Sequence, residues 1–264
     1  AVDTETFMEF VHQCGHQLTI LRVNNCDFMD NYCLYIIANV CLNLTELSMG
    51  NCTKVDQLGF GELKKCWALN RLDLSRTRID FHTLQLLLQH ATNLQHLNLS
   101  NCGQLDMDDV CLTLATFSRG LVSLQAWKTH GLTTRGLRAL ACISTIEDLD
   151  LGWALSGVIT EGLGELVRGC PHLKRLYLTA LRTLTDHDLS HLSGTAHNLQ
   201  QLDLMGTRNI TPDAVLKLLQ KCPKLQLLDI SFCEQIHSSF VNQWKNQFSK
   251  VSLKGGLKHQ VRVI

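Results

Sequence analysis

The chain has 264 residues, 45% of them hydrophobic, and its 24 basic side chains balance 24 acidic ones. The neutral charge argues against a nucleic-acid binder that works through a basic surface, and the apolar fraction argues against a disordered chain. No run approaches the roughly 18 consecutive apolar residues that a membrane-spanning helix needs. We therefore expect no nucleic-acid partner and no direct membrane insertion.

The first residues of the chain carry no targeting signal that we can identify. Residues 1–5 are not a basic segment followed by an apolar run, as a secretory signal peptide would be. Phe7, Phe10 and Val11 follow with the spacing of an amphipathic helix. Because the chain starts without methionine and close to this helix, we expect it to be part of a longer protein.

An apolar pattern, L-x-x-L-x-L, then recurs along the chain about every 26 residues, within the range of ~20–29 that leucine-rich repeats show. Two apolar positions separated by one residue indicate a short strand with one buried face. The copies begin at Leu18, Leu44, Leu69, Leu94, Leu121, Ile146, Leu173, Leu199, Leu225 and, in a weaker form, Phe248.

The segments between these strands carry helix-start residues. In residues 210–215, Thr211 is suited to the N-cap and Pro212 to the first helical position, and residues 159–163 and 184–189 repeat the design. One repeat cannot bury its own apolar face, whereas stacked copies share a core. We predict an α/β fold, a leucine-rich-repeat solenoid (horseshoe) with parallel strands on the concave face and helices on the convex face. Residues 1–264 would form a single domain of nine to ten repeats, with the tail 254–264 departing from the pattern.

Ten of the 12 cysteines occupy or adjoin fixed places in the repeat, which leaves Cys33 and Cys111 without an assigned role. One such place, three residues after the strand, holds a cysteine or a threonine in most repeats: Cys26, Cys52, Thr77, Cys102, Thr129, Thr207 and Cys233. A buried free thiol suits this place, and stacked side chains project in parallel, which disfavours disulfides. No C-x-x-C pair supports zinc. We expect free thiols, no metal, no cofactor and a reducing intracellular compartment.

Several segments, including residues 159–173, 149–153 and 228–233, resemble the cysteine-containing leucine-rich repeats of F-box proteins. The resemblance runs from about Phe7 to about Leu253. It implies the substrate-recognition domain of an SCF (Skp1–cullin–F-box) ubiquitin ligase receptor, a non-catalytic subunit that holds a protein for ubiquitination. No F-box motif occurs in this chain. Skp1 and cullin would therefore be reached through an F-box outside it.

The resemblance also implies a place of action. It points to the cytosol and, for the branch of the family that these segments resemble, to the mitochondrial outer membrane. In that branch the implied role is control of mitophagy through turnover of mitophagy receptors.

The concave face is readable because strand residues alternate between the core and the surface. Neighbouring strands lie ~4.8 Å apart, so residues at equivalent places form columns that can act together. Aromatic and charged side chains gather in the second half of the chain, and such mixtures are frequent in protein-binding hot spots. We expect a protein substrate to bind there, through Trp127, Asp150, Trp153, Arg175, Tyr177, Asp203, Asp229 and Phe232.

A structural interpretation of the same residues stays open. The aspartates would belong to the repeat pattern, and Trp153 and Phe232 would tuck into turns. We also expect Trp67 and Trp244 to be structural rather than binding residues.

Two arrangements of catalytic or metal-binding residue types are discounted. His187 and His191 have the spacing of two metal ligands on a helix but lack a third ligand. Asp73, His96 and Ser100 supply the residue types of a hydrolytic triad without a nucleophile elbow or an oxyanion hole. We expect no catalytic residues.

Other functions of a leucine-rich-repeat chain stay open beside the ligase receptor. The chain would also suit a stand-alone protein-interaction scaffold or an inhibitor. An inhibitor of a basic enzyme would need an acidic face, which the neutral charge disfavours. A GTPase activator would need an arginine acting on phosphate, and no motif supports one.

Overall fold

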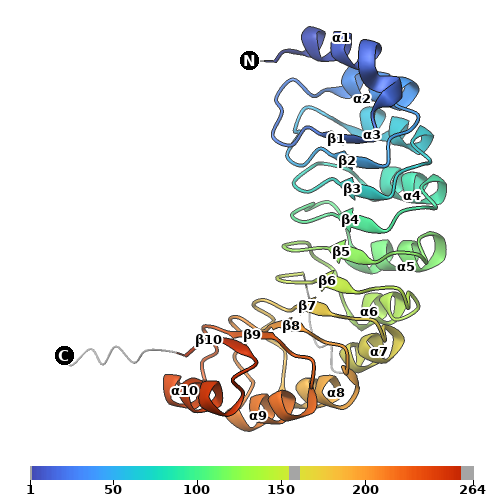
Figure 1. The fold of residues 1–264 in the computed structure, drawn as a ribbon. Coiled ribbons are helices and arrows are strands. Elements are labelled where there is room, and N and C mark those ends of the chain that lie inside the picture. The colour runs from blue at the N-terminus through green and yellow to red at the C-terminus, as the bar shows by residue number, and fades with distance from the viewer. Residues whose placement is uncertain (1, 155–160, 257–264) are drawn as a thin grey trace.

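The computed structural model describes residues 2–154 and 161–256, in which ten strands form one sheet in strict chain order. All neighbouring strands are parallel, and their apolar positions align: Leu47 lies opposite Leu72, and Leu72 opposite Leu97. Figure 1 shows the stack bending into an arc, with strands along the inner face and helices along the outer face. The predicted leucine-rich-repeat solenoid is confirmed.

The strands are β1 (Ile20–Arg22), β2 (Glu46–Ser48), β3 (Arg71–Asp73), β4 (His96–Asn98), β5 (Ser123–Gln125), β6 (Asp148–Asp150), β7 (Arg175–Tyr177), β8 (Gln201–Asp203), β9 (Leu227–Ile230) and β10 (Ser252–Gly255). The α-helices are α1 (Thr4–Cys14), α2 (Asn31–Val40), α3 (Gln57–Glu62), α4 (Phe81–His90), α5 (Met107–Phe117), α6 (Thr134–Leu140), α7 (Gly162–Gly169), α8 (Asp186–Thr195), α9 (Pro212–Lys221) and α10 (Ser238–Gln247). Among the described residues, no helix is both long and apolar enough to cross a bilayer.

The core lies between the two layers and runs without a break along the described repeats. The strand leucines are almost fully buried, as Leu47, Leu97 and Leu149 illustrate with exposures of 0%, 2% and 0%. Each buried leucine side chain stabilises the fold by roughly 1.5–3 kcal/mol relative to an exposed one. Because every repeat contributes the same positions, the apolar surface of one is covered by the next.

The predicted helix starts are present wherever the structure describes them. Thr211 accepts a hydrogen bond from the Ala214 amide, with Pro212 in the first turn of α9. Thr185 forms a capping box with Asp188 at the start of α8. Two parts of the predictions fall outside the described residues: the helix start at residues 159–160 and the end of the tail, 257–264.

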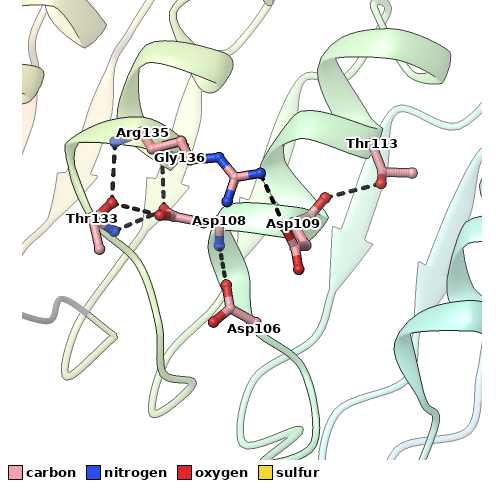
Figure 2. Close-up of polar contacts among 7 residues, drawn as sticks. All are labelled: Asp106, Asp108, Asp109, Thr113, Thr133, Arg135 and Gly136. Carbon is pink, nitrogen blue, oxygen red and sulfur yellow. Dashed lines mark hydrogen bonds and ion pairs between the residues drawn. The ribbon is translucent and has the colours of Figure 1, made fainter.

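Neighbouring helices are also joined through their N-termini, by a polar side chain in the first turn of one helix that binds the cap of the next. Asp108 of α5 is buried and accepts hydrogen bonds from the Thr133 amide, at 2.8 Å, and from the Gly136 amide, at 2.8 Å (Figure 2). Asp186 of α8 binds the Thr211 amide and hydroxyl, each at 2.7 Å. These bonds fix the spacing between successive helices.

At the repeat position that holds cysteine or threonine, the side chains donate hydrogen bonds to backbone carbonyls of the turns. Cys52 Sγ donates to the Val23 carbonyl at 3.0 Å and Cys102 Sγ to the Leu74 carbonyl at 3.1 Å. Thr77 Oγ1 donates to the Leu74 carbonyl at 2.7 Å, so either residue type serves. These side chains thus give the buried backbone carbonyls of the turns hydrogen-bond donors.

All twelve cysteines are free, and most are buried, including Cys33 and Cys111 inside the helix layer. Burial raises the pKa of the Cys66 and Cys170 thiols to about 12 in each case, which makes them poor nucleophiles. The expectation of burial is wrong for Cys142, which is exposed at the end of α6.

Candidate functional site

A turn follows each strand, and in most repeats one residue of it has a left-handed backbone conformation. In the first half of the chain this place is often asparagine, as in Asn25, Asn51 and Asn101. In the second half Trp153 and Phe232 occupy it, with φ of 60° and 59°. This conformation costs a residue other than glycine or asparagine roughly 1–2 kcal/mol.

The rings of Trp153 and Phe232 point outward from these turns. Their side chains are 50% and 70% exposed, so the alternative interpretation, in which they tuck into the turns, is wrong. The reason is that the left-handed backbone turns Cβ away from the core. A largely exposed aromatic ring on an unfavourable backbone contributes little to the stability of the monomer, and such conflicts concentrate at functional sites.

The two rings border one cleft. It has a volume of about 400 Å³ and is lined between the rings by Thr179, Ala180, Met205 and Gly206, with Arg182, Arg208 and Glu234 on its rim. Arg208 and Glu234 form an ion pair at 2.9 Å. We call this hollow between Trp153 and Phe232 the aromatic cleft.

Sequence reasoning missed the aromatic cleft, although a signal for it exists. The turn column reads Trp153, Ala180, Gly206, Phe232 in four successive repeats, that is, large, small, small, large. Strands are ~4.8 Å apart, so the two large residues stand roughly 15 Å from each other with a gap between them. Reading the column across repeats, rather than along one repeat, predicts the hollow.

The three predicted aspartates hold turns. One oxygen of Asp150 accepts from the Gly152 amide at 3.0 Å, one of Asp203 from the Met205 amide at 2.7 Å, and one of Asp229 from the Ser231 amide at 2.9 Å. Asp73 and Asn98 make the same bond in the first half. Each aspartate thus has a structural role in its turn, and its role in substrate binding stays a prediction.

The second carboxylate oxygens remain on the concave face. That of Asp203 accepts from Thr179 Oγ1 at 3.1 Å. Burial raises the pKa of Asp150 and of Asp203, and neighbouring carboxylates add to both shifts. In the described part of the chain neither carboxylate has an ion-pair partner within 4.0 Å, so negative charge is concentrated beside the aromatic cleft.

The other predicted site residues are arranged differently. Arg175 is held by Asp148 in an ion pair at 3.0 Å, and the Tyr177 hydroxyl donates to Gln201 Oε1 at 3.1 Å. Trp127 lines a separate hollow with Asn101, and its ring lies 4.8 Å from Lys128 Nζ. The structure therefore groups Trp153 and Phe232 around one cleft and places Asp150 and Asp203 next to it. Trp127 does not line this cleft, but its ring packs beside Gly152, close to Asp150 and Thr179.

The first half of the concave face is polar and in part electrostatically compensated. One of its hollows has a volume of about 290 Å³. Glu46 lies between Arg22, at 2.6 Å, and Arg71, at 3.7 Å. The charges of Glu46, Arg22 and Arg71 are thus paired, whereas Asp73 in the same hollow forms no ion pair with another described side chain.

The discounted motifs remain unassembled. Asp73 lines both hollows of the first half, whereas His96 lines one of them and Ser100 the other. The rings of His187 and His191 lie 4.9 Å apart, and within the described residues no group of three potential ligands could hold a metal ion.

The two tryptophans expected to be structural differ. Trp244 is 2% exposed and stacks on Phe240, as predicted, but Trp67 is 61% exposed. Trp67 lies in the loop after Cys66, outside the apolar positions of the repeat, so the core does not cover it.

Comparisons with known proteins agree with the solenoid. No family model matches the chain. The chain is 35% identical over 251 residues to F-box/LRR-repeat protein 4 of Bos taurus, covering 94% of this chain and 40% of that protein. It is 24% identical over 291 residues to DNA repair protein rhp7 of Schizosaccharomyces pombe, covering 93% of this chain and 50% of that protein. The chain thus spans half or less of the length of these two relatives.

Among solved structures, the chain resembles one in the crystal structure of the yeast Rad7 and Elc1 complex. The TM-score is 0.68 at 17% identity, and the match covers 99% of this chain and 76% of that one. At this identity the likeness concerns the fold.

Proposed function

We propose, from the premise that this chain is a leucine-rich-repeat domain similar to that of F-box/LRR-repeat protein 4, that it recognises protein substrates for a ubiquitin ligase. The chain would be the non-catalytic, substrate-holding part, and Skp1 and cullin would be engaged through an F-box outside residues 1–264. The substrate would bind the second half of the concave face and the adjoining turns.

The aromatic cleft carries this proposal. Trp153 and Phe232 present exposed rings from turns that are fixed by the parallel sheet. Rigid aromatic anchors beside a hollow dominate the energetics of many protein interfaces. A solenoid also presents such anchors on a backbone that needs little further ordering at binding, because every repeat is packed against its neighbours.

Degradation of bound proteins tests the proposal. Cells express the gene product that carries this chain, either unchanged or with Trp153→Asn and Phe232→Asn, and protein abundance is measured with and without inhibition of the proteasome. We expect a set of proteins to fall in abundance only with the unchanged product, and to recover on inhibition. Asn is chosen because the chain itself uses it at this place in Asn25, Asn51 and Asn101.

A matched control separates recognition from general damage. Arg76 occupies the same left-handed place in the first half, with φ of 55°, so Arg76→Asn makes the equivalent change away from the aromatic cleft. This variant should degrade the same proteins as the unchanged product. Partners that are captured without Skp1 and without any change in abundance would indicate a stand-alone scaffold and contradict the ligase proposal.

A finer part of the proposal concerns the substrates. The family resemblance supports turnover of mitophagy receptors at the mitochondrial outer membrane. In that case the Trp153→Asn, Phe232→Asn variant should fail to restore normal mitophagy in cells that lack the gene product. Normal mitophagy with this variant would remove the finer part and leave the general proposal intact.

A further inference from the structure

We propose that the aromatic cleft takes a bulky apolar side chain from a substrate segment that carries an arginine or lysine beside it, directed towards Asp150 and Asp203. The inference rests on the proposed function and adds the chemistry of the bound segment. It commits to a basic–apolar peptide of a protein partner as the occupant of the cleft.

The apolar half of this recognition comes from the cleft itself. Its two rings, with Ala180, Met205 and Gly206 between them, offer carbon surface that the chain does not cover. A Cβ added at Gly206 would meet Ala180 atoms no closer than 3.6 Å, so the middle of the turn column is open. A leucine, methionine or aromatic side chain entering between the rings would lose its contact with water on several sides.

The basic half follows from charge complementarity on the concave side of the cleft. Thr179 lines the cleft and donates to Asp203, and the Gly152 amide next to Trp153 donates to Asp150. Both carboxylates therefore stand directly under the cleft residues. Each has used one oxygen for its turn, which leaves oxygens able to accept from a guanidinium or an ammonium group.

No cation forms an ion pair with either carboxylate in the described part of the chain. Arg175 is engaged by Asp148 at 3.0 Å. Lys254 of β10 is in register with Asp229, two strands from Asp203, and it lowers the pKa of Asp203 less than the neighbouring Asp229 raises it. The remaining negative charge falls between β6 and β8, beneath the cleft.

The opposite rim of the cleft carries the other sign. Arg208 is compensated by Glu234 at 2.9 Å, whereas Arg182 forms no ion pair with another described side chain. The field across the cleft thus runs from a positive outer rim to a negative concave side. It orients the basic residue of the segment inward, and it disfavours phosphate groups at the carboxylates.

A peptide selection tests the inference directly. The chain of residues 1–264 is immobilised and used to select from a phage library of random 12-residue peptides. We expect enrichment of sequences that place arginine or lysine within a few residues of a bulky apolar side chain. Affinities of the enriched peptides are then measured by fluorescence polarisation at low and high salt.

Two variants divide the site into its halves. Trp153→Asn with Phe232→Asn should weaken binding at least tenfold. Asp150→Asn with Asp203→Asn should also weaken it about tenfold, remove its salt dependence and abolish the preference for basic residues. Asn preserves the turn bond, as Asn98 does in the first half. Arg76→Asn should leave the affinity unchanged.

Each other outcome overturns the inference. No enrichment, enrichment without a basic residue, or binding that both double variants retain would contradict it. Self-association that Trp153→Asn and Phe232→Asn abolish would assign the cleft to a second copy of the chain. If proteins are still degraded through the cleft while the peptides lack basic residues, only this inference fails and the proposed function stands.

Discussion

The two halves of the solenoid share a backbone and differ in what they place on it. In the first half the left-handed turn residues are mostly polar, and Asn51 Nδ2 donates to Asn25 Oδ1 at 3.0 Å, one repeat to the next. In the second half the same places hold Trp153 and Phe232, whose rings make the walls of a cleft. The repeat fixes the conformation of these turns, and it leaves the outward side chain free to serve either stability or binding.

The concave charges differ in the same way. Glu46 in the first half is flanked by two arginines, and the hydrogen bond to Arg22 lowers its pKa. Asp150 and Asp203 in the second half form no ion pair with another described side chain, and burial raises the pKa of each. Compensated charge stabilises a free protein, whereas uncompensated charge is available to a partner.

The largest expected effect concerns the hydrogen bonds that link the N-termini of neighbouring helices, and it tests whether these bonds stabilise both halves. Asp108→Ala leaves the half-buried amide of Thr133 and the buried amide of Gly136 without their acceptor, which should lower the unfolding free energy by about 3 kcal/mol. Asp186→Ala, in a half-buried setting, should cost about 2 kcal/mol. Urea denaturation measures both.

Asp109 provides the control for this comparison. It forms an exposed ion pair with Arg135 at 3.3 Å (Figure 2), so Asp109→Ala should change the unfolding free energy by no more than about 0.5 kcal/mol. If Asp108→Ala lowered the unfolding free energy by no more than this control does, the hydrogen bonds of Asp108 would not stabilise the stack of repeats.

A medium effect is expected from exchanging turn residues between the halves. Trp153→Asn and Phe232→Asn relieve the left-handed conformation, and each should raise the unfolding free energy by about 0.5 kcal/mol after the loss of ring contacts. The reverse change, Asn101→Trp, should lower it by about 1 kcal/mol. If Trp153→Asn lowered the unfolding free energy by more than about 1 kcal/mol, the Trp153 ring would be structural.

The smallest effect concerns pH. Because burial raises the pKa of Asp150 in the folded state, the contribution of this group to stability is greatest below about pH 3.8, its ordinary pKa, and is lost as the pH rises through the folded value. Asp150→Asn removes that loss. The variant should match the unchanged chain in acid and exceed its unfolding free energy at pH 7, by less than about 1 kcal/mol.

Thermal or urea unfolding at both pH values checks this prediction. If the difference in unfolding free energy between Asp150→Asn and the unchanged chain were the same at pH 3 and at pH 7, the raised pKa of Asp150 would be contradicted.

Much of the fold follows from single-repeat patterns. The leucine positions predict the strands, and Thr211 with Pro212 predicts the start of α9. The candidate site was predicted only in part, since Asp150 and Asp203 were assigned to the correct face but their bonds to the turn amides depend on local geometry. The exposure of Trp67 and the outward rings of Trp153 and Phe232 could not be read along the chain, because they depend on which way a turn directs Cβ.

The sequence by itself determined that the protein is a stack of leucine-rich repeats, because the periodicity of its apolar side chains admits one way of burying them. Only the tertiary structure decided which surface residues act together. Trp153 and Phe232 are separated by three repeats along the chain and by Ala180 and Gly206 across it. Stacking in parallel register converts that long separation in sequence into a single cleft, because each repeat advances the turn column by only one strand spacing.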